Sequence, residues 1–212
     1  ITTSNAFKTS YNYKRNLDSH LMKNTEWGAV AYLTHSIYGK CSGTTCEEVY
    51  INNNSNYITG WSGITVDASS SISDGYAYSH ANSVKASSTG NYSGIYDLSG
   101  GLNEYVAGVR GDLTEGSGGF TSSDVSTYSK KYYDTYSTSM DDRWIYTTRI
   151  LGDATAETKG WNGDGANSVT SNAPWFYRGS DYVGKSFAGI FYFNGTTGAG
   201  FTTYSFRVVL AF

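Results

Sequence analysis

The sequence predicts one α+β domain that is irregular and loop-rich, with small antiparallel sheets and one or two helices. Its 212 residues include 25 glycines, 20 tyrosines and one proline, and only 16% are charged, a composition typical of β-rich or irregular folds. One stretch, residues 22–39, has a clear helical period, whereas the final SFRVVLAF alternates as a β-strand does. Neither an internal repeat nor a linker interrupts the chain, so residues 1–212 are predicted to form a single domain.

The predicted helix presents an apolar stripe at intervals of three and four residues, made of Trp27, Val30, Ala31, Thr34 and Ile37 or Tyr38. Asn24 or Thr25 can cap its start, and Gly39 is expected to end it. Residues 1–20 show no helical period. They are therefore predicted to be an N-terminal strand or an ordered arm.

Charge and hydropathy argue against several classes of partner. The net charge is −3, which favours neither nucleic acid nor an anionic membrane surface. Apolar runs stay well below the ~20 residues needed to span a bilayer. The chain starts at Ile1 without a signal sequence, so we expect a mature or trimmed ectodomain that meets a membrane only through a missing anchor segment.

Two cysteines, Cys41 and Cys46, enclose Ser-Gly-Thr-Thr. A zinc site would need about four ligands, and the spacing differs from the Cys-x-x-Cys of redox pairs. A small disulfide loop in an exported protein fits better, which predicts an extracellular or cell-surface location.

Residues that could carry catalysis or a metal are scattered. The three histidines lie apart within the first 80 residues, at His20, His35 and His80. Asp141 and Asp142 would point to opposite faces of a strand, and residues 162–167 lack the terminal glutamate of a calcium loop. We therefore expect no catalytic residue, no metal and no cofactor.

Glu104 lies in an otherwise apolar stretch, SGIYDLSGGLNEYVAG, at residues 93–108. A buried carboxylate is either catalytic or paired with a cation, and pairing with a buried arginine is the commoner case. The sequence therefore predicts a structural role for Glu104.

The C-terminal stretch, residues 174–212, has side chains suited to contact. Residues 175–206 contain eleven aromatic residues and only three charged ones, set among Ser, Gly, Thr and Asn. Tyrosine offers a large amphipathic area at low entropic cost, and Ser, Gly and Asn adapt their hydrogen bonds, as in antibody paratopes. A tyrosine-rich β-meander around a core would produce the same composition and is the alternative.

Three segments occur in an order that resembles a known family: EWGAVAYL, YDLSGGLNEYVAG, and PWFYRGSDY followed by SFRVVLAF. They resemble the formylglycine-generating-enzyme branch of the C-type-lectin fold. The matching positions are Tyr96, Asp97, Gly100, Glu104, Tyr105, Arg178, Gly179, Ser180, Phe206, Arg207 and Val208. The resemblance implies that Glu104 and Arg178 are structural partners joining two motifs, within a fixed frame that includes Trp175 and Arg207.

The oxidases of that branch use a cysteine pair in their C-terminal part, and no cysteine follows Cys46 here. Its iron-dependent members need a histidine cluster, which this sequence lacks. The resemblance therefore carries no catalytic residue to this chain.

The same branch includes the variable proteins of diversity-generating retroelements, in which adenine positions of codons are randomised. The C-terminal stretch resembles theirs, a fixed frame interleaved with positions reachable from Asn codons. The expected ligand-binding positions are Tyr177, Ser180, Asp181, Tyr182, Val183, Phe187, Ile190, Tyr192, Thr197, Phe201, Thr203 and Tyr204.

The sequence therefore predicts a non-enzymatic adhesin or receptor-binding protein with a diversified C-terminal face. Its expected partner is a protein or glycan on another surface, and its carrier would be a phage, a bacterial cell or a pilus. A structural pilus, tail-fibre or surface subunit that assembles through the Tyr-rich face is the first alternative. A formylglycine-generating-type oxidase is a remote second alternative.

Overall fold

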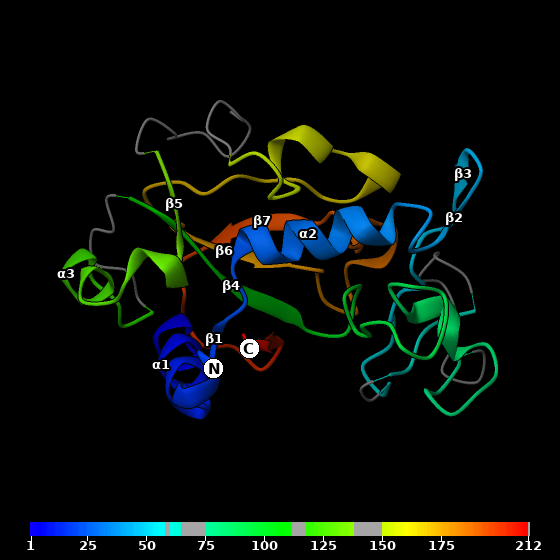
Figure 1. The fold of residues 1–212 in the computed structure, drawn as a ribbon, viewed down its shortest axis with the longest axis horizontal. Helices are drawn as coiled ribbons and strands as arrows, with labels where there is room; N and C mark the ends of the chain where they lie inside the picture. Colours follow the sequence, from blue (N-terminus) through cyan, green and yellow to red (C-terminus); the bar gives the residue numbers. More distant parts are fainter. Residues whose placement is uncertain (58–59, 65–74, 112–117, 138–149, 212) are drawn as a thin grey trace.

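A computed structural model of the chain describes residues 1–57, 60–64, 75–111, 118–137 and 150–211 (Figure 1). Within these ranges the chain is a mixed α+β fold with few helices and small sheets, as predicted. Asp141 and Asp142 lie outside the described residues. None of the described helices is both long enough and apolar enough to span a membrane.

Helix α1, Thr3–Tyr13, contradicts the prediction of a strand or arm at the N-terminus. The Thr2 hydroxyl accepts a hydrogen bond from the Asn5 amide and caps the helix. The buried face of α1 combines Phe7 with small and polar residues, Thr3, Ser4, Ala6 and Ser10. Because so few of these side chains are apolar, the helical period could not be recognised in the sequence.

Helix α2, Asn24–Thr34, confirms the central part of the predicted helix but is shorter. Its N-cap is Lys23, whose amide donates to Glu26 at 2.8 Å, and neither Asn24 nor Thr25 caps it. The helix ends five residues before Gly39, so the predicted stripe is buried only as far as Thr34. Ile37 and Tyr38, predicted to continue the stripe, are 71% and 78% exposed.

The central sheet has five strands around β4, Asn103–Arg110. On one side β4 pairs with β6, Trp175–Arg178, which pairs with β7, Phe193–Thr196, both antiparallel. On its other side β4 pairs in parallel with β8, Tyr204–Phe206, and with β5, Asp134–Tyr136. The sheet is therefore mixed, whereas small antiparallel sheets were predicted.

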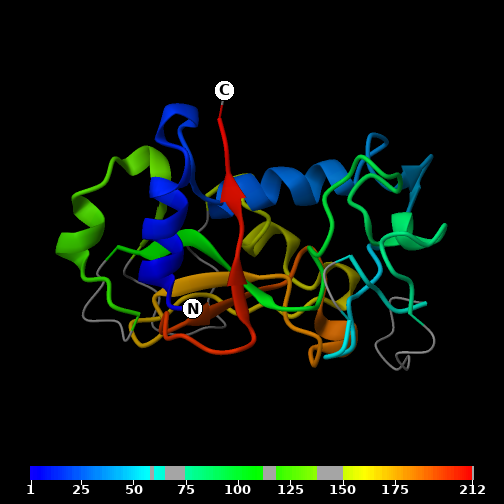
Figure 2. The same cartoon turned by 90° about the horizontal axis from the view of Figure 1, so that it is seen from below.

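Two further sheets are two-stranded. Strand β1, His20–Leu21, pairs with β9, Val208–Val209, so the segment that follows α1 lies beside the last strand of the chain. Figure 2 shows this last strand in red, ending at the C-terminus. The short hairpin of β2, Cys41–Ser42, and β3, Thr45–Cys46, carries the disulfide. The predicted final strand is divided at Arg207, so its halves β8 and β9 join different sheets.

The core consists of two clusters, one containing residues of α1 and the other residues of α2. Successive side chains of a strand point to opposite faces. Accordingly, Tyr105, Ala107 and Val109 of β4 pack in the α1 cluster, whereas Val106 packs in the α2 cluster. Figures 1 and 2 show α2 running along one face of the sheet.

Short helical turns connect these elements. They are η1, Arg15–Leu17; η3, Ser83–Ala86; α3, Ser122–Ser126; η4, Lys130–Tyr132; η5, Ala156–Thr158; η6, Trp161–Gly163; and η7, Lys185–Phe187.

Candidate ligand-binding face

The loop of residues 180–184 is the centre of the candidate face, and it begins where β6 ends. Gly179 and Ser180 have φ values of 78° and 63°, a left-handed conformation that turns the chain sharply out of the sheet. Asp181 fixes the loop because its carboxylate accepts bonds from the Val183 amide and from Nδ2 of Asn103 in β4, both at 3.1 Å. The loop is therefore held rigidly over the edge of the sheet.

One side of this loop borders an open hollow of about 470 Å³, which we call the tyrosine depression. Its lining residues come from β4, β6, the 180–184 loop, the residue before β7, and β8 with the segment that precedes it. Eight of the twelve predicted ligand-binding residues are among them: Tyr177, Ser180, Asp181, Val183, Tyr192, Phe201, Thr203 and Tyr204. The fold thus gathers most of the predicted set, which is dispersed over 28 residues of sequence, at one place.

Hydrogen bonds between side chains organise the floor of the depression. The hydroxyl groups of Tyr177 and Tyr192 lie 3.2 Å apart, and Nδ2 of Asn194 donates to both, at 2.9 Å and 3.2 Å. Burial raises the pKa of Tyr177 well above its ordinary value, so its hydroxyl stays neutral. The floor is therefore uncharged and preorganised.

Aromatic packing ties the depression to the core. The Tyr204 ring lies 4.9 Å from that of Tyr105, 5.3 Å from that of Tyr177 and 5.3 Å from that of Phe201. Tyr177 and Tyr192 are each only 9% exposed, whereas Val183 and Phe201 are 60% and 55% exposed. The tyrosines of the floor thus serve the fold as well as the surface, and the rim offers free apolar area.

The remaining predicted residues lie elsewhere. Phe187 and Thr197 are exposed but do not line the depression, and Tyr182 lines the neighbouring pocket. Ile190 is 2% exposed and packs in the α2 cluster, so the prediction that it contacts a ligand is wrong. Its type is reachable from an Asn codon, but that criterion takes no account of burial.

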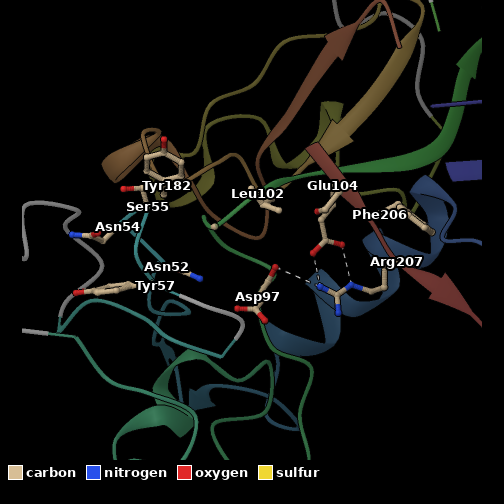
Figure 3. Close-up of a pocket in the computed structure, with 12 residues that line it drawn as sticks. Asn52, Asn54, Ser55, Tyr57, Asp97, Leu102, Glu104, Tyr182, Phe206 and Arg207 are labelled. Carbon is tan, nitrogen blue, oxygen red and sulfur yellow. Dashed lines mark hydrogen bonds and ion pairs between the residues drawn. The ribbon is translucent and has the colours of Figure 1, made fainter. Parts of the chain in front are cut away.

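The other side of the loop borders a second pocket, of about 570 Å³, which we call the Asn52 pocket (Figure 3). It is lined by Asn52, Asn54, Ser55, Tyr57, Asp97, Gly101, Leu102, Glu104, Tyr182, Ser205, Phe206 and Arg207. The sequence does not indicate that residues 50–57 contribute to a pocket. The backbone amide of Asn52 donates a hydrogen bond to the carbonyl oxygen of Ser99, and this contact places these residues. No periodic pattern in the sequence predicts it.

An ion pair forms one wall of the Asn52 pocket. Glu104 is 6% exposed, and its two carboxylate oxygens accept bonds from Nε and Nη2 of Arg207. Burial raises the pKa of Glu104, and the Arg207 charge opposes that rise. The predicted structural role of Glu104 is supported, but its cation is Arg207 and not Arg178.

Arg178 holds a different site. It is completely buried and donates to Oδ1 of Asn24 at 3.1 Å and to the carbonyl groups of Asp153 and Ala154 at 3.3 Å and 2.9 Å. Burial lowers its pKa to about 10. Arg178 and Glu104 are paired in the register of β6 and β4, but the Arg178 side chain donates to the three groups just named, whereas Glu104 accepts from Arg207.

The predicted disulfide between Cys41 and Cys46 is confirmed. Trp175, predicted to belong to the fixed frame, is fully buried in the α1 cluster. Among the described residues, a group of three potential metal ligands is found at His35, Cys41 and Cys46. Both sulfur atoms there are already bonded to each other, so this group does not hold a metal while the disulfide is intact.

A pair of carboxyl groups, Glu48 and Asp164, lies near the end of α2. Asp164 is 4% exposed and accepts a bond from the Phe191 amide at 2.8 Å. Burial raises the pKa of Glu48 to about 7, and burial together with the Glu48 charge raises that of Asp164 well above its ordinary value. Near neutral pH the pair therefore retains a proton.

Comparison with known proteins does not identify a relative. No protein-family model matches the chain, and a search of curated proteins finds no match. The function is therefore argued from the site itself.

Proposed function

We propose that this protein is a surface-displayed binding protein whose ligand contacts the tyrosine depression and its rim. The observation that carries the proposal is that eight predicted contact residues line one hollow, and two of them, Val183 and Phe201, are exposed at its rim. Aromatic and aliphatic anchors inside a polar rim are the features that give protein interfaces most of their binding energy.

The arrangement of the motifs supports membership of the C-type-lectin fold, formylglycine-generating-enzyme branch. The second and third motifs occupy adjacent strands, β4 and β6, and Glu104 joins the second motif to Arg207 of the last one. The pairing of β1 with β9 closes the chain on itself. On this proposal residues 177–204 present the variable positions, interleaved with residues of the fixed frame.

The disulfide supports display outside the cytoplasm, because such bonds persist in oxidising compartments. A protein or glycan on another cell, phage or host surface is the proposed partner. Assembly of identical subunits through the same face is the competing function, since exposed apolar side chains also serve that purpose.

Binding is tested by screening the purified chain against arrays of extracellular proteins and glycans. Each hit is then remeasured with Val183→Ser/Phe201→Ser. Both positions are exposed, so the double variant should keep the wild-type melting temperature and lose at least about tenfold in affinity. Ile37→Ser, an equally exposed apolar position at the end of α2, is the matched control and should bind as wild type.

The same variants separate the two functions. Ligand binding by a monomer supports the proposal. Concentration-dependent oligomers that Val183→Ser/Phe201→Ser dissolves, without a ligand in either array, would favour a structural subunit instead.

A further inference from the structure

The Asn52 pocket differs in chemistry from the tyrosine depression beside it. Figure 3 places the rings of Tyr57 and Tyr182 toward one end and the Asp97, Glu104 and Arg207 side chains toward the other, with Asn52 between them. The two hollows share the 180–184 loop, because Tyr182 lines one and Val183 the other. A partner covering the loop would therefore reach both.

The groups that face the pocket are mainly hydrogen-bond acceptors. Asn52 is 4% exposed, and its Oδ1 has no hydrogen-bond partner among the described residues. Burial raises the pKa of Asp97, and interactions with the Gly60 amide, the Arg207 charge and the Asn52 side chain oppose that rise, so the amide group of Asn52 lies close to the Asp97 carboxyl. A buried hydrogen-bond acceptor without a partner lowers the stability of the fold, so a ligand that donates a hydrogen bond to this oxygen would be bound favourably.

The charges of the pocket leave an excess of one negative charge. Asp97 and Glu104 are acidic, and Arg207 is the basic residue of the lining. Arg207 is bound to Glu104 through Nε and Nη2, and Nη2 also meets the carbonyl oxygen of Asp97 at 3.4 Å. The Asp97 carboxylate accepts bonds from the Gly60 amide, at 2.9 Å and 3.0 Å. No cation of the lining therefore contacts the Asp97 carboxylate.

A neutral hydroxyl group could satisfy Asn52 but would leave the Asp97 carboxylate without a cation in direct contact. A primary ammonium group does both, since it offers three donors and one positive charge. Its aliphatic stem would pack against Leu102 and Tyr182, and aromatic walls attract cations.

We propose that the Asn52 pocket binds a lysine side chain of a protein partner. The ammonium group would lie between Oδ1 of Asn52 and the Asp97 carboxylate. This inference rests on the proposed function and adds to it the chemical class of the partner, a protein with an exposed lysine at its contact surface.

The test is an NMR titration with Nα-acetyl-lysine N-methylamide, followed through the amide signals of residues 50–57 and 97–104. The expected dissociation constant is on the order of 1–10 mM, as for a ligand of this size. The neutral Nε-acetylated form of the same compound should bind at least about tenfold more weakly, because it lacks the charge.

Asp97→Asn should weaken binding of the lysine compound at least about tenfold, since it keeps a hydrogen-bond acceptor for Gly60 and removes the charge. Asn52→Leu is a second variant in case Asp97→Asn does not fold, and it should reduce binding similarly. Glu47→Gln is the matched control; it removes one exposed carboxylate outside the pocket and should leave the titration unchanged.

Equal binding of the two lysine compounds, binding of neither, or tighter binding of N-acetylglucosamine would each overturn the inference. Failure of the proposed function looks different. In that case the lysine compound would still bind, but no array hit would depend on Val183 and Phe201.

Discussion

At the scale of single residues, the buried charges constrain the molecule most. Glu104 of β4 forms an ion pair with Arg207, the residue between β8 and β9. The Glu104 side chain is only 7% exposed. Removing one member of a buried pair leaves the other charge without a partner, which costs more than the pair contributes.

Arg207→Met should therefore lower the free energy of unfolding by about 3 kcal/mol. The double variant Glu104→Leu/Arg207→Met should recover most of that loss, because no charge is left buried. Urea denaturation of the three proteins checks this, and a double variant no more stable than Arg207→Met would show that the lost contacts, not the charge, account for the effect.

The Glu48–Asp164 pair makes stability depend on pH. The Glu48 pKa is 4.5 in its ordinary state and about 7 in the fold, so the folded protein keeps a proton that the unfolded chain loses. The stabilisation is complete below about pH 4.5 and is lost as the pH rises through 7.

Glu48→Gln stays neutral at every pH, so it should melt at a higher temperature than wild type at pH 8 and near the wild-type temperature at pH 5. Melting curves at both values measure this. Asp97, Asp134 and Asp153 also have pKa values raised by burial, so the comparison with wild type is needed to isolate Glu48. An unchanged difference between the two pH values would contradict the assignment.

At the scale of elements, helix α1 stabilises the fold through its aromatic contacts. The Phe7 ring is 1% exposed and lies 5.4 Å from that of Phe120 and 4.9 Å from that of Tyr128, both edge-on. These contacts attach the N-terminus to the sheet face beneath the tyrosine depression.

Phe7→Ala should destabilise the protein by about 3–5 kcal/mol, the usual cost of deleting a buried phenylalanine. Tyr13→Ala, at the exposed end of the same helix, should change stability by less than about 0.5 kcal/mol. Chemical denaturation gives both values. Equal, small effects would mean that α1 is a dispensable arm.

The elements also show what could be predicted from sequence. The spacing of Trp27, Ala31 and Thr34, which are buried, predicts helix α2 from the sequence. Helix α1 buries polar residues such as Thr3 and Ser10, so its sequence shows no hydrophobic period. The composition of the C-terminal stretch, rich in aromatic and poor in charged residues, is evident from the sequence. However, its tyrosines were expected at the surface, and Tyr177 and Tyr192 are largely buried because their hydroxyl groups satisfy one another.

Of the two hollows that border the 180–184 loop, only the tyrosine depression could be predicted from the sequence. Composition selected residues of the tyrosine depression, because they share one stretch of sequence. The Asn52 pocket combines residues from four distant segments, namely 52–57, 97–104, Tyr182 and 205–207. The register of β8 on β4 and the contact of Asn52 with Ser99 bring segments of this set together only in three dimensions.

At the scale of the whole molecule, the disulfide is peripheral. It closes a loop with a sequence separation of only 5, and loop entropy then contributes about 2 kcal/mol. Cys41→Ser/Cys46→Ser should therefore fold, lose roughly that much stability and bind any ligand of the face as wild type. Unfolding of this variant in urea measures the loss, and failure to fold would show that the hairpin organises more than its own turn.

We propose that residues 177–204 form a diversified binding face on a fixed frame. The most direct measurement is sequencing of this gene and its flanking DNA in many clones, with a search for a non-coding near-copy of codons 174–212 beside a reverse transcriptase. We predict substitutions at the residues that line the tyrosine depression and at its rim, with Trp175, Arg178 and Arg207 unchanged. Substitutions spread evenly over frame and rim, or clones that are all identical with no near-copy, would contradict the claim.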